Sequence, residues 1–319
     1  MMTLITSDIN KAKELLDNED VVAIPTETVY GLAGNIFSDK ALKKIYALKN
    51  RPSFNPLIVH IKSMSDLSLV ACEIPDKALK LADAFWPGPL TLILKKQPTI
   101  SDIITAGKPT VAVRIPNHPV ALELLNKLDY PVAAPSANPF TSISPTTAQH
   151  VFEFFDSELK LILEGGACSK GVESTIVGFK DNEVILYRHG STSIEAIEKV
   201  IGKVKFLTND AIAPDAPGML KKHYSPKTPI ILSDSIEESM KLYSNKKIGI
   251  LLFNAENADL KVECIEILSE DSNLEEAASN LYAALHRLDK CNLELIIAEK
   301  FPNKGQGKTI NDRLDRAAN

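Results

Sequence analysis

Cysteines are few and scattered in this sequence of 319 residues. Cys72, Cys168, Cys264 and Cys291 form no CxxC pair, and none has a histidine at the spacing of a zinc site. This pattern argues against zinc-finger and zinc-ribbon modules, and no other metal-ligand motif stands out. We therefore expect four reduced cysteines packed in a core and no resident metal.

Long apolar runs are also missing. Met1–Lys13 has no apolar run long enough for a signal peptide, and no stretch approaches the roughly 20 apolar residues of a membrane helix. Positive charge is not in excess, because the formal net charge is -5. The sequence therefore predicts a cytoplasmic protein without a membrane span or a general basic coat, so that any anion site is local.

Several common catalytic motifs are missing from the sequence. The sequence has no GxSxG and no HExxH motif. The segment Gly305–Thr309 (GQGKT) looks like the end of a P-loop, but the position that requires the first glycine is Pro302. Only ten residues follow Thr309, which argues against a P-loop NTPase.

Helix and strand patterns alternate along most of the chain, which is typical of an α/β protein. The patterns predict helices over 8–17, 39–48, 76–85, 118–128, from Pro145, 193–201, 235–243 and 273–289. They predict strands over 21–24, 57–61, 90–95, 110–115, 131–134, 161–163, 174–179, 183–188, 229–232, 247–253, 262–267 and 293–298.

A chain of this length suits two domains, and a proline-rich segment suggests where they divide. Residues 209–229 contain four prolines and little apolar periodicity. We predict a first domain over 1–208, a linker or lid over 209–229, and a smaller domain over 230–319. The order of elements in the smaller domain predicts a largely parallel, open sheet.

Four stretches contain neither aspartate nor glutamate. They are residues 40–65, 103–122, 130–152 and 216–233, and all contain basic or hydroxyl side chains. Segments that converge on a bound triphosphate gain from excluding carboxylates, because like charges repel. Any one such stretch could arise by chance, but four of them together favour a binding site for an anion.

Polar loops follow predicted strands at 25–32 and 135–147. In open α/β sheets, ligands bind beyond the carboxyl ends of the strands. Hydroxyl and amide groups there suit phosphate or ribose, although the same residue types also favour turns and helix caps.

Several cations stand at the ends of predicted elements. Lys49 and Arg51 end a helix, where they would either complement the helix dipole or grip phosphate. Arg114 and Arg188 close apolar strands and need an anionic partner, either a ligand or an internal carboxylate. His60 lies within a strand, as a core residue or a site residue.

An ordered series of motifs resembles one family. The motifs are PTETVYGL (25–32), KNRPSFNPLIVHI (49–61), WPGPLTLIL (86–94), VAVRIP (111–116), APSAN (134–138), SPTT (144–147) and ESTIV (173–177). They resemble the YrdC-type domain of L-threonylcarbamoyladenylate synthase. Segments 217–229 and 305–318 resemble its long two-domain form, which implies a YrdC-type twisted open sheet domain followed by a smaller Rossmann-like α/β domain.

The resemblance implies a reaction in which L-threonine, bicarbonate and ATP give threonylcarbamoyl-AMP and pyrophosphate. The threonine carbamate would attack the α-phosphate of ATP, with Mg²⁺ carried on the phosphates. A transient partner, a tRNA threonylcarbamoyltransferase, would then modify adenosine 37 of tRNA. The protein itself would bind tRNA weakly at most.

The resemblance also implies roles for individual residues. Threonine would be held by Thr28, His60, Arg114, Ala134 and Ser174. ATP would be held by Arg51, Asn55, Thr110, Ser136, Asn138, Ser144 and Arg188, with Tyr224 folding over it as a lid. Lys49 and Arg51 would be the catalytic cations beside the phosphates.

The sequence departs from the family pattern at Phe140-Thr141, at Gly178 and at His189. None of these positions has a role assigned above, but the first puts the path of its loop in doubt. Two alternatives remain at this stage. One is a non-enzymatic RNA-binding module, against which the low aromatic content argues. The other is a carbamoyltransferase of hydrogenase maturation, which would carry zinc modules that this sequence lacks.

Overall fold

The computed structural model describes residues 2–181, 183–206, 222–257 and 260–319. The chain folds into two compact units. Unit 1 comprises Met1–Phe140, Pro145–Cys168 and Glu173–Met219, and unit 2 comprises Thr141–Ser144, Ser169–Val172 and Leu220–Asn319. The predicted boundary at 208–209 and the predicted linker as far as 221 lie outside the described residues.

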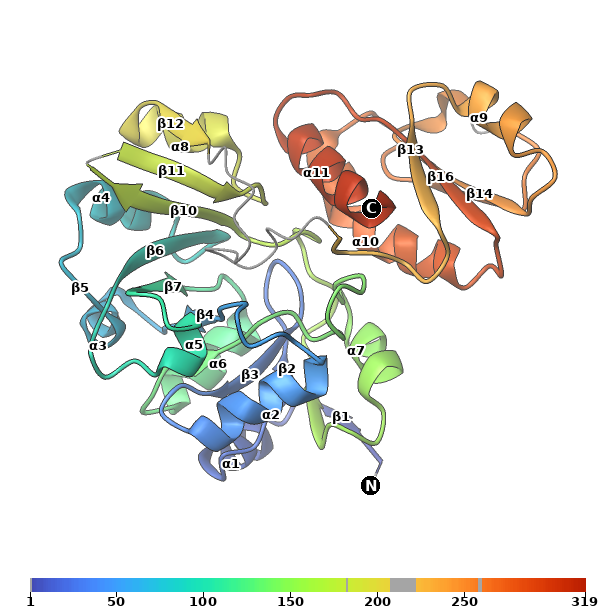
Figure 1. Ribbon diagram of the computed structural model, residues 1–319. Helices are drawn as coiled ribbons and strands as arrows, with labels where there is room; N and C mark the ends of the chain where they lie inside the picture. The colour runs from blue at the N-terminus through green and yellow to red at the C-terminus, as the bar shows by residue number, and fades with distance from the viewer. Residues whose placement is uncertain (1, 182, 207–221, 258–259) are drawn as a thin grey trace. The chain divides into compact units, whose positions relative to one another are not determined.

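Unit 1 is built around a mixed sheet with the strand order β1-β9-β2-β3-β8-β4-β7-β6-β10-β11-β12, and β5 pairs with β6 at the side (Figure 1). Its strands are β1 (Leu4–Thr6), β2 (Val22–Ile24), β3 (Gly31–Asn35), β4 (Ile58–His60), β5 (Ala71–Cys72), β6 (Leu90–Lys96), β7 (Thr110–Arg114), β8 (Val132–Ala133), β9 (Leu161–Leu163), β10 (Thr175–Lys180), β11 (Glu183–Arg188) and β12 (Val204–Phe206). Its helices are α1 (Ile9–Asp17), α2 (Asp39–Lys49), α3 (Leu67–Val70), α4 (Asp76–Phe85), α5 (Asp102–Thr105), α6 (Pro119–Lys127), α7 (Ala148–Phe155) and α8 (Ile194–Ile201), with a 3₁₀ turn η1 (Met64–Asp66).

Unit 2 contains a four-stranded parallel sheet with the order β13-β16-β14-β15. Its elements are β13 (Ile230–Ser233), α9 (Ile236–Leu242), β14 (Ile248–Leu252), η2 (Ala255–Asn257), β15 (Cys264–Ile267), α10 (Leu274–Asp289), β16 (Leu295–Glu299) and α11 (Gln306–Ala318). The predicted α/β class is confirmed, and so is the parallel sheet of the smaller domain.

Helix α2 shows how local sequence sets up the later geometry. Ser38 is its N-cap, and its hydroxyl accepts a hydrogen bond from Ala41 N at 3.2 Å. The helix ends at Lys49 because Asn50 adopts a left-handed conformation with φ of 50°. The chain turns at Asn50, and the two cations that flank it contact different loops: Lys49 bonds to Ser136 O, and Arg51 bonds to Asn55.

Some elements differ from the prediction. The helix expected from Pro145 begins at Ala148, because Thr147 is the N-cap and its hydroxyl accepts a hydrogen bond from His150 N at 3.2 Å. The segment Gly31–Asn35 is a strand, although its glycines resemble a loop. The GQGKT segment opens α11, and a side chain at Gly307 would place Cβ 1.9 Å from Pro302 O. This glycine therefore serves close backbone packing.

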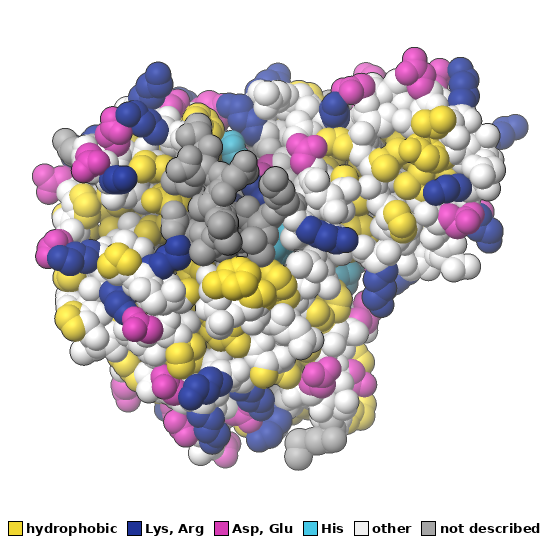
Figure 2. Space-filling view, viewed as in Figure 1, with side chains coloured by type: hydrophobic (Ala, Val, Ile, Leu, Met, Phe, Trp, Pro, Cys, Tyr) yellow, Lys and Arg dark blue, Asp and Glu magenta, His cyan; other side chains and the backbone are white. Residues whose placement is uncertain are grey.

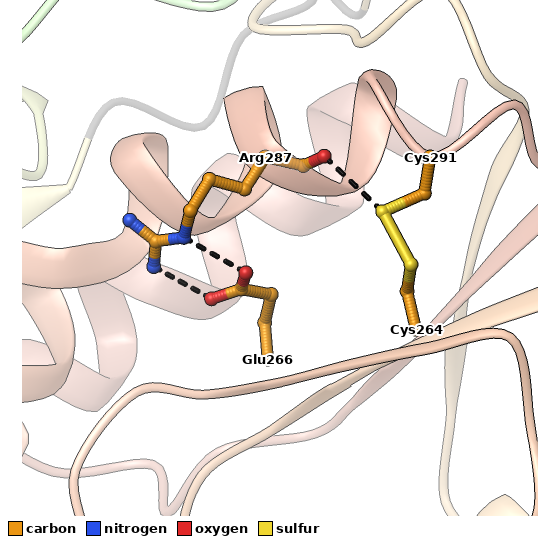
Figure 3. The surroundings of a disulfide bond; sticks show 4 residues. All are labelled: Cys264, Glu266, Arg287 and Cys291. Atoms are coloured by element: carbon orange, nitrogen blue, oxygen red, sulfur yellow. Dashed lines mark hydrogen bonds and ion pairs between the residues drawn. A yellow bond between two sulfur atoms is a disulfide. The ribbon is translucent and has the colours of Figure 1, made fainter.

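Two of the four cysteines form a disulfide, which corrects the expectation of four reduced thiols. Cys264 on β15 is bonded to Cys291 just after α10, with the two Cα atoms 6.8 Å apart (Figure 3). Nearby, Arg287 on α10 donates to both carboxylate oxygens of Glu266 on β15, at 2.8 and 2.6 Å. The pairing spans 27 residues, so no short motif in the sequence reveals it. Cys168 is buried as expected, and Cys72 is half-buried.

None of the helices in the described part of the chain combines the length and apolar composition that a bilayer crossing requires. On the face shown in Figure 2, basic and acidic side chains are interspersed on the surface. This distribution agrees with the expectation of a surface without a general basic coat.

The core of unit 1 occupies one face of its central strands. On β7, Val111 and Val113 point into the main core, together with Leu92 and Leu94 of β6 and Val59 of β4. Because successive side chains of a strand point to opposite faces, the alternate positions of the same strands line the other face.

We predict that Asp20→Asn destabilises the protein by about 1 kcal/mol at pH 7. Asp20 is 8% exposed and pairs with Lys44 and Lys160. Burial raises its pKa, but the hydrogen bonds from Lys160, Lys44 and Val21 N outweigh burial and lower the pKa to about 2. Solvent screens these partly exposed lysines, which limits the expected loss of free energy.

The carboxylate stabilises the folded state fully only above its unfolded pKa of 3.8. The difference in unfolding free energy between wild type and Asp20→Asn should therefore shrink as the pH falls from 4 towards the folded pKa of about 2. Urea unfolding across this range measures it. A difference that stayed constant with pH would contradict the assigned charge pairing.

Candidate active site

The second face of the central strands carries a small apolar patch. Ile58, Ile93, Ala112 and Ile176 come from four different strands and pack together with Tyr187. We call these five residues the apolar floor. The first four occupy alternate positions of β4, β6, β7 and β10, so the sequence period of two places them opposite the main core, and Tyr187 of β11 packs against them.

Strand directions bring polar residues together at one end of this floor. β4 and β7 run parallel and end at His60 and Arg114, which are register partners. β6 runs antiparallel to β7, and β10 runs parallel to β6. The first residues of β6 and the residue before β10 therefore reach the same edge, which adds Thr91 and Ser174.

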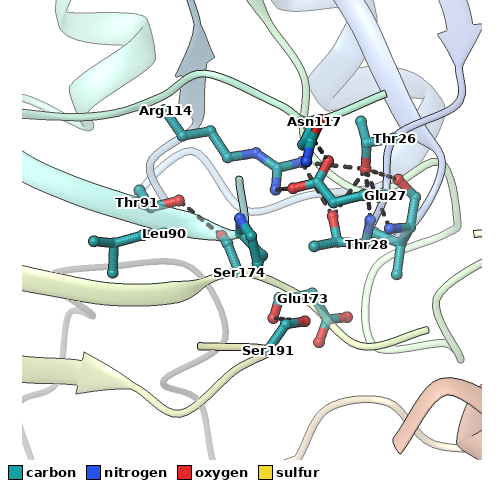
Figure 4. A network of polar contacts seen from close by, with 12 residues as sticks. Thr26, Glu27, Thr28, Leu90, Thr91, Arg114, Asn117, Glu173, Ser174 and Ser191 are labelled. Carbon is teal, nitrogen blue, oxygen red and sulfur yellow. Dashed lines mark hydrogen bonds and ion pairs between the residues drawn. The ribbon is translucent and has the colours of Figure 1, made fainter. Parts of the chain in front are cut away.

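Arg114 is the centre of a buried hydrogen-bond network (Figure 4). Its side chain is almost completely buried, with 4% of the residue exposed. Its Nη1 donates to Glu27 Oε1 at 3.2 Å, and its Nη2 donates to the hydroxyls of Thr26 and Thr28 at 3.2 and 3.1 Å. Burial lowers the pKa of Arg114, and the carboxylate of Glu27 acts in the opposite direction.

His60 is a fixed neutral acceptor for Arg114. Arg114 Nε donates to His60 Nε2 at 2.8 Å, and His60 Nδ1 lies 3.3 Å from Ile58 O. Burial, followed by the charge of Arg114, holds the pKa of His60 well below its usual value. The proton is therefore assigned to Nδ1, and both ring nitrogens have partners in the protein. His60 acts on the site through Arg114.

Ser174 and Arg188 form a second cluster. The hydroxyl of Ser174 lies 2.7 Å from that of Thr91. Arg188 closes β11, and its Nη2 donates to Ser174 Oγ at 3.1 Å and to Ser174 O at 2.8 Å. Figure 4 shows Ser174 and Thr91 beside the Arg114 network.

Glu173 reaches this cluster because Gly190 allows close packing. A Cβ on Gly190 would lie 2.4 Å from Glu173 O. The same carbonyl accepts hydrogen bonds from Ser191 N at 2.9 Å and from Ser191 Oγ at 3.2 Å. The His189-Gly190 pair thus keeps the glycine that the turn needs. Glu173 is itself buried.

Lys49 holds the loop that contains Ser136 and Asn138. It is 1% exposed, and its Nζ donates to Ser136 O at 2.5 Å and to Asn138 O at 2.6 Å. In return, Lys49 O accepts a hydrogen bond from Phe140 N at 2.7 Å. Burial, followed by the charge of Arg51, holds the pKa of Lys49 well below its usual value.

Arg51 holds the loop that follows it. Its Nε donates to Asn55 O at 3.1 Å, and its Nη2 donates to Asn55 Oδ1 at 2.8 Å and to Pro56 O at 2.7 Å. Asn55 is fully buried, and its Nδ2 has no hydrogen-bond partner among the described residues. This loop thus contains a buried donor without an assigned acceptor.

Glu173 connects the clusters electrostatically. Burial lowers the pKa of both Lys49 and Arg114. The charge of Glu173 partly offsets this lowering in both, and the charge of Arg188 adds to it in Arg114. Arg114 and Arg188 end strands at the edge that carries His60 and Ser174, whereas Lys49 and Arg51 hold the loops at 136–140 and 51–56. The carboxylates of Glu27 and Glu173 belong to segments outside the four acid-free stretches.

Four further predicted residues take no part in the hydrogen bonds described above. Ala134 lies beside the apolar floor, since its N–H donates to Ile58 O at 3.0 Å. Thr110 begins β7, at the opposite end from Arg114, in a 490 Å³ pocket that includes Ile93, Tyr187 and Lys95. Ser144 and Tyr224 belong to unit 2, so they are described apart from the clusters of unit 1.

Within unit 2, Ser144 and Tyr224 are both buried. Ser144 O lies 3.2 Å from His286 Nε2. The ring of Tyr224 stacks on Tyr282, with centroids 5.8 Å apart, and the guanidinium of Arg313 lies 4.6 Å from its centroid. The predicted role of Tyr224 as a lid stays a prediction.

Comparison with known proteins gives matches over almost the whole chain. Residues 14–190 match the Sua5, YciO and YrdC family, which is described as "Telomere recombination". Residues 192–319 match the family described as "Threonylcarbamoyl-AMP synthase, C-terminal domain". The chain belongs to the threonylcarbamoyl-AMP synthase family. The family predicted from the sequence motifs is thereby confirmed.

Individual members of this family are similar over nearly their full length. The threonylcarbamoyl-AMP synthase of Bacillus subtilis (strain 168) is 40% identical, over 99% of this chain and 94% of the relative. That of Pyrococcus abyssi (strain GE5 / Orsay) is 39% identical, over 93% and 90%. The crystal structure of P. abyssi Sua5 complexed with L-threonine superposes with a TM-score of 0.93 at 36% identity, covering 99% of this chain and 98% of that chain.

The structure also adds residues that sequence reasoning did not assign to the synthase site. Glu27 and Thr26 contact Arg114, Thr91 contacts Ser174, and Glu173 influences both Lys49 and Arg114. Thr26 and Glu27 belong to the PTETVYGL motif, and Glu173 begins the ESTIV motif. These residues therefore lie within the quoted motifs, although the sequence alone assigned no role to a carboxylate.

We predict that Lys49→Met loosens the loop at 136–140. The methionine keeps the buried volume but cannot donate to Ser136 O and Asn138 O. Amide hydrogen exchange of Ala137 and Phe140 should accelerate by at least about tenfold, because their hydrogen bonds depend on this loop. Exposed Lys80→Met is the matched control. Unchanged exchange in Lys49→Met would show that Lys49 does not hold the loop.

Proposed function

We propose that this chain makes threonylcarbamoyl-AMP and pyrophosphate from L-threonine, bicarbonate and ATP, by means of the clusters of unit 1. The observation that carries the proposal is the buried Arg114 network beside Ser174 and Arg188, on the strand ends predicted to hold the amino acid. The similar Pyrococcus abyssi protein has been crystallised with L-threonine, which supports assigning this substrate to the chain.

Arg114 is proposed to receive the carboxylate of threonine. A guanidinium has five N–H donors, and the four hydrogen bonds of Arg114 to protein atoms leave at least one of them for a ligand. The hydroxyls of Thr28 and Ser174 lie on either side of this group (Figure 4). These hydroxyls, together with Ala134 beside the floor, would position the rest of the amino acid.

The chemistry needs positioning more than it needs a protein nucleophile. Bicarbonate loses hydroxide, which leaves as water once protonated, and becomes CO₂. The neutral amine of threonine attacks the carbon of CO₂, so that an N–C bond forms while one C=O π bond breaks to give an oxyanion, and the nitrogen releases a proton to water to give the carbamate. A carbamate oxygen then forms a bond with the α-phosphorus of ATP, and the bond to pyrophosphate breaks. Negative charge spreads over the phosphates during this step, so fixed cations close to them lower the barrier.

The phosphates are proposed to lie near Arg51, Arg188 and the loop held by Lys49. Asn55 Nδ2 is a buried donor that could take a nucleotide oxygen as its acceptor. Ser136, Asn138 and Ser144 would supply further polar contacts. The apolar floor would receive the adenine, with Thr110 at its far end, because an aromatic base needs an apolar surface flanked by a few polar groups.

Mg²⁺ is proposed to arrive on the phosphates of ATP, whose charge it partly neutralises. The described residues include no group of three or more histidine, cysteine, aspartate or glutamate side chains placed to hold a metal ion. Phosphate oxygens and water would therefore be its main ligands, and the cations above would share the remaining charge.

The product would be consumed by a partner, a tRNA threonylcarbamoyltransferase that acts on adenosine 37, with at most weak direct binding of tRNA by this chain.

We further propose that the protein works in the cytoplasm. Tyr224 is proposed to close over the nucleotide during the reaction, which would protect the adenylate from water.

The test is to incubate the protein with ATP, threonine and bicarbonate and to detect threonylcarbamoyl-AMP by mass spectrometry. We predict that Arg114→Ala and Arg51→Ala each lower threonine-dependent release of pyrophosphate by at least about 100-fold. Lys80→Ala, at an exposed position of the same unit, should have no effect. Unchanged release in either arginine variant would refute its role, and absence of the adenylate with wild type would refute the function.

A further inference from the structure

Glu27 is the carboxylate directly paired with Arg114. It lies in the loop between β2 and β3, and only 4% of it is exposed. The side chains of the pair are each 5% exposed, so solvent does not screen their attraction. A buried guanidinium requires a counter-charge, and Glu27 supplies it.

The two oxygens of Glu27 have different partners. Oε1 accepts a hydrogen bond from Arg114 Nη1 at 3.2 Å, and Oε2 accepts one from Asn117 N at 3.0 Å. Asn117 follows Arg114 by three residues, so the carboxylate ties the guanidinium to the backbone of the segment that carries it. Such a bridge fixes the rotation of the guanidinium plane in addition to neutralising its charge.

The sequence neighbours of Glu27 also bind the guanidinium of Arg114. Thr26 and Thr28 flank it in the sequence, and both of their hydroxyls accept from Arg114 Nη2. The hydroxyl of Thr26 also donates to Val29 O at 2.6 Å, which stiffens the turn. Three consecutive residues thus engage two nitrogens of one guanidinium, while His60 engages the third.

We propose that Glu27 is a positioning residue, which orients Arg114 so that a remaining N–H donor points at the carboxylate of threonine. This inference rests on the proposed function, in which Arg114 receives that carboxylate. Glu27 makes no contact with the substrate in this account. Its effect therefore falls on threonine rather than on ATP, whose proposed ligands Lys49 and Arg51 contact other loops.

The variant Glu27→Gln keeps the size of the side chain but removes its charge and one of its two acceptor oxygens. Glutamine offers one oxygen and one amide NH₂, whereas both partners of Glu27 are N–H donors. One partner must therefore face a donor, and the guanidinium loses its counter-charge. Asp20→Asn is the matched control, because Asp20 is a comparably buried carboxylate, 8% exposed, that pairs with Lys44 and Lys160 instead.

The experiment measures steady-state KM for threonine and for ATP with each variant. In Glu27→Gln the threonine KM should rise by at least about tenfold, while the ATP KM stays within about twofold of wild type. Asp20→Asn should leave both values within about twofold, even though it lowers stability. Thermal unfolding of each variant shows whether the fold is retained.

Glu27→Asp keeps the test decisive if the glutamine variant does not fold. Aspartate keeps the charge but is one methylene too short to span Arg114 and Asn117 N, so the threonine KM should rise selectively but less. A parallel rise in both KM values, or a threonine KM within about twofold of wild type, would overturn the inference. A wild-type protein that makes no threonylcarbamoyl-AMP would instead refute the proposed function itself.

Discussion

A buried positive charge and its counter-charge organise the site. Arg114 lies at the end of a strand whose neighbouring residues belong to the core, where an unpaired guanidinium would be very unfavourable. Glu27 neutralises it, His60 accepts from it as a neutral ring, and two threonine hydroxyls fix its outer edge. All four of these hydrogen bonds join Arg114 to protein atoms, so the fold itself sets the orientation of the guanidinium, which favours a preorganised site.

The sheet explains why residues distant in the sequence meet at this point. Parallel strands β4 and β7 end where antiparallel β6 begins, and β10 adds its first residues at the same edge. One face of these strands forms the core, and the other face is apolar in the middle and polar at the edge. A single alternation of side chains thus provides both a stable core and a second surface that is apolar in the middle and polar at one edge.

Much of this architecture follows from the sequence, since long periodic segments such as 39–48 and 76–85 form helices almost as predicted. Local capping overrode the pattern at Thr147, and glycines concealed the strand at Gly31–Asn35. The disulfide between Cys264 and Cys291 depends on a tertiary contact that spacing does not reveal. The acid-free stretches also did not reveal the roles of Glu27 and Glu173. Both glutamates lie in other segments, which only the tertiary fold brings next to the cations.

The guanidinium of Arg114, held by protein atoms, is proposed to bind the carboxylate of the amino acid. Isothermal titration calorimetry with L-threonine and with L-threoninol, which lacks only the carboxylate, tests this most directly in the presence of a non-hydrolysable ATP analogue. The account predicts that threoninol binds at least about 100-fold more weakly, because a charge-assisted hydrogen bond to a buried cation is lost. Equal affinity for the two compounds would contradict it.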